Sequence, residues 1–288
     1  MTSVIHGATG AQGRPLLQSL LTAGVPAVAA VRAPETYTGP GTAIAADLSS
    51  VESLTAVYRQ AAGVFVHLPM GPPPVVTAYA RNIAEAVVEA QPGRVVVSTS
   101  GQVVDSPGSP LQAPADSPIA VLLEGLARSG VSTAVLAPRL YLENLLQPAL
   151  FDAARDEGVL RYPLRSDFPA SWSSHLDVAD AAVRLLVDDR SVTGTVGVGA
   201  LPALTGPDLA AGFAAYFGRP VRFESVDPHD FAAALIPLYG EAAAAGVAAF
   251  YTLAATADHH QIDDSTGTQK LLDLTPRSIP TWLTEVVA

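Results

Sequence analysis

The 288-residue chain contains no cysteine and a single lysine, Lys270. The missing cysteines exclude disulfide bonds, thiolate metal sites and a cysteine nucleophile. The net charge is −11 and no basic cluster is present, so direct binding of nucleic acid is not expected. Residues 231–257 contain only Glu241 as a charge, but this stretch is mostly alanine and is interrupted by Pro237 and Gly240, which indicates two helices and no membrane span. With no basic leader and no signal-peptide cleavage pattern, we expect a cytoplasmic protein.

Hydrophobic residues make up 49% of the chain, enough for a large buried core. Short apolar runs alternate with helical patterns such as residues 75–90 and 119–128. The runs expected to form strands are residues 4–6, 27–31, 43–48, 64–68, 94–101 and 133–138. Continuous apolar strands of this kind are buried on both faces, which is typical of a parallel, doubly wound sheet. The sequence therefore predicts an α/β fold.

The first of these strands runs into three glycines, Gly7, Gly10 and Gly13, spaced G-x-x-G-x-x-G. Such glycines allow a sharp turn and a close approach of the backbone to a diphosphate. A helical pattern follows at once, and Pro15 suits its first turn because proline has no N–H to leave unpaired. The free N–H groups and the positive end of that helix attract negative charge. This motif predicts a dinucleotide site at the start of the chain.

The ends of the next two strands carry charged residues. Arg32 ends the second strand, where an arginine accommodates a 2′-phosphate and favours NADP(H) over NAD. The alternative is a solvated surface arginine, and the only nearby acid is Glu35. Asp47 ends the third strand. Its carboxylate either accepts a hydrogen bond from the adenine amino group or caps the helix that begins near Val51.

Ligands of such sheets bind outside the carboxyl ends of the strands. That rule gathers the glycine loop, Arg32, residues 67–70, residues 98–101 and the segment after Pro138 around one crevice. The residues predicted to contact the cofactor are Gly7, Thr9, Gly10, Gln12, Gly13, Arg32, Asp47, Leu48, His67, Leu68, Pro69, Ser98 and Pro138.

The glycine loop, Arg32 and the stretch 129–144, which ends in Pro138-Arg139-Leu140-Tyr141-Leu142-Glu143-Asn144, resemble NmrA-like proteins. These are atypical members of the short-chain dehydrogenase/reductase superfamily, and residues 177–182 and 204–221 agree with the resemblance. It implies a Rossmann domain that binds NADP(H) and a smaller, discontinuous C-terminal α+β lobe that covers the substrate. We expect the former in residues 1–150, with a return segment at about 172–200, and the latter mostly in 151–288.

The chain departs from the superfamily's catalytic pattern. The standard pair is Tyr-x-x-x-Lys, in which the lysine lowers the tyrosine's pKa for proton transfer. Here no tyrosine has a lysine four residues on, and Ile119–Leu123 occupies the region where many NmrA-like proteins carry a lysine. The usual Arg-Pro-Gly is replaced by Ala137-Pro138-Arg139. Standard alcohol–ketone dehydrogenase chemistry is therefore not expected.

Four residues remain as candidate catalytic groups. His67 closes the fourth strand and either donates to a substrate carbonyl or is simply packed. Ser100 is a donor to substrate or ribose, or it caps its own loop. Tyr141 faces the substrate space or belongs to the core. His175 is a proton donor if Asp177 orients it, unless Asp177 caps the helix expected to start directly after it.

Other polar residues have simpler interpretations. Arg139 pairs with Glu143 four residues on, or it reaches an anionic substrate. His259 and His260 are interpreted as a solvated turn, and no metal is expected. The aromatic side chains after residue 200 suit a flat apolar ligand or form core; they are Phe213, Tyr216, Phe217, Phe231, Tyr239, Phe250 and Tyr251.

Three functions fit these observations. The first is an NADPH-dependent reductase of a quinone-like or conjugated carbonyl compound, whose delocalised product anion needs positioning and modest acid help. The second is a non-catalytic NADP(H) sensor that binds a protein regulator. The third is a natural-product isomerase or cyclase on the same fold. The expected partner is an apolar or aromatic small molecule, and a homodimer is left open.

Overall fold

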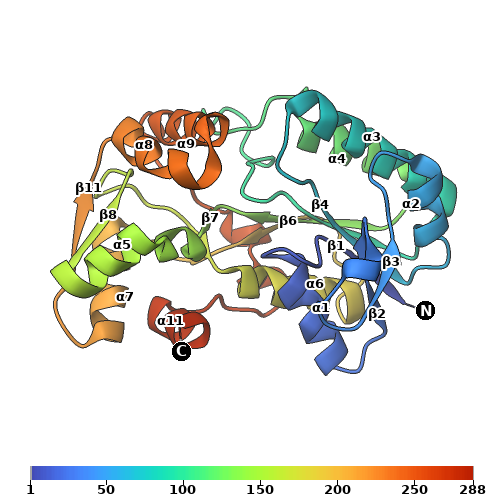
Figure 1. Ribbon diagram of the computed structural model, residues 1–288, viewed down its shortest axis with the longest axis horizontal. Coiled ribbons are helices and arrows are strands. Elements are labelled where there is room, and N and C mark those ends of the chain that lie inside the picture. The colour runs from blue at the N-terminus through green and yellow to red at the C-terminus, as the bar shows by residue number, and fades with distance from the viewer. Residues whose placement is uncertain (1, 288) are drawn as a thin grey trace.

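The computed structural model describes residues 2–287 and is built on a seven-stranded parallel sheet (Figure 1). The strands are β1 (Ser3–His6), β2 (Ala27–Val31), β3 (Thr42–Ala45), β4 (Gly63–His67), β5 (Val95–Ser98), β6 (Thr133–Pro138) and β10 (Gly194–Val198). Their order is β10-β6-β5-β4-β1-β2-β3, and every pair is parallel. The order reverses between β1 and β4, so their carboxyl ends flank the crevice where ligands of such sheets bind. The predicted doubly wound α/β fold is confirmed.

Helices cover both faces of the sheet. On one face lie α1 (Gly13–Thr22) and α6 (His175–Val187), which pack on the sheet through residues such as Leu17 and Leu185. On the other lie α2 (Val51–Tyr58), α3 (Pro73–Ala90) and α4 (Pro118–Ser129). Neighbouring strand residues enter opposite cores: Val4 packs beneath α2 to α4, and Ile5 beneath α1 and α6. This two-sided burial explains why the strands are apolar throughout.

A second core lies beyond the carboxyl ends of the strands, on the side of the sheet away from the N-terminus (Figure 1). Its strands pair in parallel, β7 (Leu140–Tyr141) with β9 (Trp172–Ser173) and β8 (Val159–Tyr162) with β11 (Arg222–Ser225). Its helical segments are η2 (Leu142–Leu146), α5 (Pro148–Asp152), a π-helical turn (Ala153–Glu157), α7 (Gly206–Phe217), α8 (Pro228–Tyr239), α9 (Glu241–Ala254) and α11 (Ile279–Val287). Short turns η1 (Pro34–Thr36), η4 (Asp264–Thr266) and α10 (Thr268–Leu271) complete the structure. The expected boundary at residue 150 stays a prediction.

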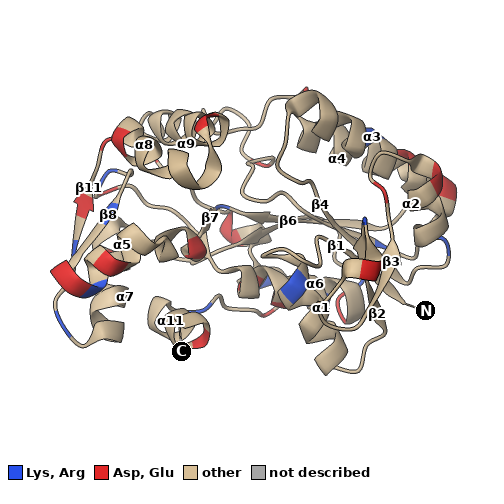
Figure 2. Ribbon diagram, viewed as in Figure 1, with Lys and Arg blue, Asp and Glu red and all other residues tan. Residues whose placement is uncertain are grey.

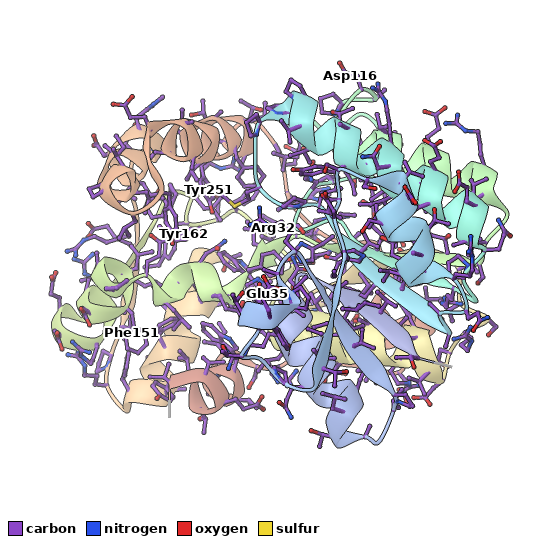
Figure 3. All side chains as sticks on the ribbon, turned by 45° about the vertical axis from the view of Figure 1, so that its right-hand side comes forward. Arg32, Glu35, Asp116, Phe151, Tyr162 and Tyr251 are labelled. Carbon is purple, nitrogen blue, oxygen red and sulfur yellow. The ribbon has the colours of Figure 1, made fainter. Side chains whose placement is uncertain are left out.

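The aromatic residues of this second core pack on one another. Tyr162 lies edge-on to Trp172, Phe231 and Tyr251, with ring centroids 5.4, 5.5 and 5.4 Å away. The hydroxyls of Tyr162 and Tyr251 are hydrogen-bonded to each other, and Figure 3 shows the two side chains pointing together. The core interpretation is therefore correct for Phe231 and Tyr251, whereas Tyr239 is 57% exposed.

Two predicted strands are shorter than expected. The third ends at Ala45, because the Asp47 carboxylate accepts a hydrogen bond from the Ser49 N–H at 2.8 Å and turns the chain. The fifth ends at Ser98, because Ser100 and Gly101 take left-handed φ angles of +54° and +89°.

Charge is sparse on this molecule, and Figure 2 shows lysine and arginine scattered singly in this view. The alanine-rich stretch forms the two expected helices, α8 and α9, which meet at Gly240. In residues 2–287, no helix combines the length and the apolar character that a membrane span requires.

Candidate functional site

The glycine loop forms a tight turn between β1 and α1. Gly7 has a left-handed φ of +64°, and the Gly10 N–H donates to its carbonyl at 2.8 Å. A Cβ on Gly13 would lie 2.5 Å from the carbonyl oxygens of Gly7 and His6, so only glycine lets α1 start this close to the strand. The amino end of α1 is thereby presented at the end of β1, where it attracts an anion.

A cavity of about 440 Å³ opens beside this loop, between the ends of β1, β2 and β4. Seven predicted cofactor contacts line it: Gly7, Thr9, Arg32, Asp47, Leu48, His67 and Pro69. The other six do not: Gly10, Gln12, Gly13, Leu68, Ser98 and Pro138. His6, Met70 and Tyr79, which the sequence interpretation did not select, complete parts of the wall.

Two arginines face a second cavity of about 320 Å³, which shares Thr9 and Arg32 with the first. Arg14, at the start of α1, lines it together with Tyr37. Within residues 2–287 neither guanidinium makes a salt bridge, and Figure 3 shows Arg32 and Glu35 close together at the front of the molecule. Two available guanidiniums suit a phosphate monoester, which supports the preference for NADP(H). Arg14 directly follows Gly13, a signal that sequence reasoning passed over.

Asp47 does not cap the helix as one interpretation expected. Ser50 is the N-cap of α2 and accepts from the Ser53 N–H at 3.1 Å. The Asp47 carboxylate instead accepts from the hydroxyl and the N–H of Ser49, and these hydrogen bonds hold its pKa below the ordinary value. It is exposed on the wall of the larger cavity, so its contact with an adenine amino group stays a prediction.

Gln12 braces the glycine loop from beneath. It is 7% exposed and accepts from the Ser98 hydroxyl at 2.6 Å, while its own amide donates to the Ser100 hydroxyl at 3.0 Å. These bonds connect the loop to the end of β5, the next strand but one. Gln12, Ser98 and Ser100 thus form one positioning network, and the Ser100 hydroxyl is already engaged as an acceptor.

His67 lies directly over Gly7. A Cβ built on Gly7 would be 1.9 Å from the His67 Nε2, so the imidazole occupies the space that any other residue at position 7 would need. This Nε2 is buried and has no hydrogen-bond partner, and burial lowers the pKa of the ring. Below it, His6 pairs with the Tyr58 hydroxyl at 2.9 Å, and burial lowers the pKa of His6 to about 4. Both histidines are therefore neutral at physiological pH.

Tyr141 and His175 form a tilted pair of rings close to the ends of β4 and β5, with Tyr141 near Ser98 and His175 near His67. Their ring centroids are 4.2 Å apart and the planes are inclined by 37°. The Tyr141 hydroxyl is buried without a well-formed hydrogen bond, and burial raises its pKa above the ordinary value even though Ser98 is near. Burial also lowers the pKa of His175 to about 4, with a smaller effect from His67. The pair therefore presents an uncharged phenol and an uncharged imidazole.

Asp177 does not orient His175. The helix begins at His175 with Ser174 as its N-cap, and Asp177 completes a capping box by accepting from the Ser174 N–H at 2.7 Å. Its other oxygen accepts from the Arg277 guanidinium at 2.9 Å. The expected helix start after Asp177 is therefore wrong by three residues, and the carboxylate has other partners.

Glu143 faces His175 in its place. Its Oε1 accepts from the backbone N–H of His175 at 2.9 Å and from the indole N–H of Trp282 at 3.2 Å. Its Oε2 lies 3.5 Å from the His175 Nδ1 and has no hydrogen bond. Burial raises the pKa of the Glu143 carboxyl. Sequence reasoning missed this role, although Glu143 stood in the stretch that carried the family resemblance.

Arg139 does not pair with Glu143. It is buried and makes a salt bridge with Asp105 at 2.7 Å, and its remaining N–H groups donate to the carbonyls of Ala137 and Gln261. The turn with the two adjacent histidines also differs from expectation, because His260 is only 3% exposed. Within residues 2–287, histidine and carboxylate side chains form no group of three that is able to hold a metal.

These features fit a dinucleotide. The glycine loop leaves no room for side chains beneath a diphosphate, and two arginines face the neighbouring cavity. The buried His67 Nε2 and Tyr141 hydroxyl lack partners on the same side of the sheet, and such buried atoms usually have one. The arrangement provides a nucleotide cradle next to neutral hydrogen-bonding groups.

Comparison with known proteins agrees with this arrangement. The NAD(P)H azoreductase of Xenophilus azovorans is 28% identical over 227 residues, which cover 77% of this chain and 76% of the relative. The Escherichia coli NADPH-dependent quinone oxidoreductase, solved with NADPH, is 22% identical with a TM-score of 0.79 over 100% of both chains. The Citrobacter triphenylmethane reductase, solved with NADP(H), is 17% identical with a TM-score of 0.80 over 99% of this chain and 100% of the other. The two structural likenesses show a shared fold.

The extent of the family match decides where the chain belongs. The profile of the NmrA-like family covers residues 2–283, which include the glycine loop, both arginines and the Tyr141–His175 pair. The chain is therefore a member of the NmrA-like family.

Proposed function

We propose that this protein is an NADPH-dependent reductase of a quinone-like or conjugated carbonyl compound. The observation that carries the proposal is the position of the Tyr141–His175 pair near His67, which itself lies over Gly7 of the glycine loop. The named activities of the azoreductase relative and the quinone reductase neighbour support an NAD(P)H-dependent oxidoreductase of this general kind.

The chain's own residues divide the work of holding the cofactor. The glycine loop and the amino end of α1 bind the diphosphate, and Arg14 and Arg32 bind the 2′-phosphate. Gln12 keeps the loop in register with β5 through Ser98 and Ser100. Bound NADPH supplies a hydride in this position.

The acceptor side supplies hydrogen bonds rather than a strong acid. The Tyr141 phenol stays protonated because burial raises its pKa, so it donates to an oxygen that becomes negative. No lysine stands beside it to lower that pKa, since Lys270 is exposed on α10. A conjugated acceptor matches such a site, because its product anion is delocalised and needs less stabilisation than a simple alkoxide.

The direct test is oxidation of NADPH in the presence of menadione. We expect steady turnover that is lost in Arg32→Glu, because the substitution places a carboxylate beside the 2′-phosphate. Tight NADPH binding without turnover over a panel of quinones, azo compounds and carbonyls would support the sensor instead. Product formed without net consumption of cofactor would support the isomerase or cyclase.

A variant panel identifies the groups that contact the acceptor. Tyr141→Phe removes one hydroxyl and is expected to lower turnover about 10- to 100-fold. His67→Ala and Ser100→Ala test two of the other three candidates. Full turnover in all three variants would contradict this choice of donors.

A further inference from the structure

The two oxygens of the Glu143 carboxyl are in different situations. Oε1 is fully engaged, because it accepts from the His175 backbone N–H at 2.9 Å and from the Trp282 indole at 3.2 Å. Oε2 is buried without a hydrogen bond and lies 3.5 Å from the His175 Nδ1. An unpaired buried oxygen facing a ring nitrogen is costly unless a proton lies between them.

The charges around Glu143 favour that proton. Burial raises the pKa of the Glu143 carboxyl more than the hydrogen bonds to its oxygens lower it, and the like charge of Asp177 adds a smaller increase. The Arg277 guanidinium, which pairs with Asp177, is also engaged by Asp180 and Glu285, at 2.9, 2.8 and 2.7 Å for the three pairs. On the facing elements, His175 and Tyr141 are both uncharged. A protonated Oε2 donating to Nδ1 leaves the hydrogen of the imidazole on Nε2.

We propose that Glu143 stores the proton that completes reduction of the acceptor and that His175 relays this proton. The inference rests on the proposed function and deepens it, because it defines acceptors that need a proton as well as a hydride. His175 keeps 17% of its side chain exposed, so the imidazole is not fully enclosed by protein.

The step balances in atoms and charge. NADPH is oxidised to NADP⁺, and the acceptor gains a hydride and becomes an oxyanion. The Nε2–H bond of His175 then breaks as an O–H bond forms on the acceptor. The proton of Glu143 moves from Oε2 to Nδ1, so His175 remains neutral and Glu143 becomes a carboxylate. The two N–H groups on Oε1 stabilise this carboxylate until solvent returns a proton.

Glu143 is thus a positioning residue and proton source that acts through His175. A comparison of two acceptors separates this role from a merely structural one. Menadione needs a hydride and a proton on oxygen. A cationic triphenylmethane dye takes a hydride at its central carbon and needs no proton.

The key variant is Glu143→Gln. Its amide keeps the shape of the carboxyl group, and its oxygen is able to accept hydrogen bonds from the same two N–H groups, but it has no acidic proton to transfer. We expect the ratio of menadione rate to dye rate to fall about 100-fold, the usual contribution of general acid catalysis. Glu143→Asp, which retains an acid, should recover part of the ratio. The matched control is Glu124→Gln, whose carboxylate is 66% exposed in a surface ion pair with Arg128 and should leave the ratio unchanged.

Two measurements do not depend on the variant's turnover. In wild-type protein, heavy water should slow menadione reduction and leave dye reduction unaffected. In the cofactor-free protein at neutral pH, infrared spectra should show the C=O stretch of a protonated carboxyl that is missing from Glu143→Gln.

The outcomes separate the two proposals. The relay would be overturned if Glu143→Gln left the menadione-to-dye ratio unchanged, whether both rates fell equally or neither fell. An ionised Glu143 in the infrared spectrum would also overturn it. A wild-type protein that reduces neither acceptor would overturn the proposed function. In that case the infrared band still decides the protonation state on which the relay depends.

Discussion

The two sides of the crevice are built in different ways. The nucleotide side comes from contiguous backbone, the loop from Gly7 to Arg14, with Arg32 from the next strand. The acceptor side brings together Tyr141, His175 and Trp282, which lie on three separate elements and are largely buried. The first side presents free N–H groups and exposed cations, and the second presents buried side chains whose charge is suppressed. Local geometry defines one half of the site, and tertiary packing defines the other.

The largest effect is expected from Gly7→Ala, which disrupts only the nucleotide side. Gly7→Ala places a Cβ 1.9 Å from the His67 Nε2 and adds strain at a φ of +64°. We expect NADPH affinity to fall by at least about 100-fold, equivalent to roughly 3 kcal/mol. Isothermal titration calorimetry measures this loss.

Gly24→Ala is the matched control. Gly24 has a φ of +72° with nothing within 4 Å of the added Cβ. It carries the same kind of backbone strain, about 1 kcal/mol, without the clash. Equal affinity losses in the two variants would contradict the importance of the Gly7–His67 contact.

Lowering the pH should weaken both sides. The pKa values of His6 and His175 are about 4 in the folded protein, below the ordinary 6.5. The unfolded chain therefore binds protons first, and the stabilisation present above pH 6.5 is lost as the pH falls toward 4. Between pH 7 and pH 5 each histidine should lower the free energy of unfolding by about 2 kcal/mol.

Urea unfolding at the two pH values measures this loss. In His6→Gln the new side chain is still able to hydrogen-bond to Tyr58. The fall in the free energy of unfolding between pH 7 and pH 5 should be about 2 kcal/mol smaller in this variant than in wild type. The same pH dependence in both proteins would show that folding does not lower the pKa of His6.

A substitution at Arg32 tests the nucleotide side through one group, the 2′-phosphate that NADPH has and NADH lacks. Arg32→Ala should weaken NADPH binding about 10- to 30-fold, or roughly 2 kcal/mol, and leave NADH binding nearly unchanged. Arg59→Ala, an exposed arginine at the end of α2, is the control. Equal losses for both coenzymes would place the 2′-phosphate elsewhere.

The smallest effect is expected on the acceptor side. Trp282→Phe keeps most of the buried packing but removes the N–H that donates to Glu143 at 3.2 Å. We expect a loss of about 1 kcal/mol in the free energy of unfolding and less than about a tenfold fall in the menadione-to-dye ratio. Phe213→Leu, in the same core, should lower stability without moving the ratio. A shift of the ratio in Phe213→Leu would assign the effect to packing.

The sequence was a good guide where the information is local. The boundaries of β2 and β6 agree with their apolar runs, and Gly240 separates the two alanine-rich helices as expected, although Pro237 lies within α8 and does not interrupt it. The seven predicted contacts that line the cavity follow from one rule about strand ends.

Partnerships between distant side chains could not be predicted in this way. Spacing of four residues suggested a pair of Arg139 with Glu143, but η2 begins at Leu142 and turns the two side chains apart. Glu143 instead meets His175 and Trp282, which are 32 and 139 residues further on. Of the two interpretations of Asp177, helix capping is correct in kind, although the helix begins at His175 rather than at Val178.

The central claim is that NADPH bound at the glycine loop delivers its hydride to an acceptor beside Tyr141 and His175. Anaerobic single-turnover oxidation of one equivalent of NADPH by menadione, followed by stopped-flow absorbance, tests it most directly. We predict full oxidation by wild type and by Gly24→Ala, and much slower oxidation by Gly7→Ala at the same protein concentration, because less NADPH is bound. Oxidation that persists undiminished in Gly7→Ala, or NADPH that wild type binds tightly but never oxidises, would contradict it.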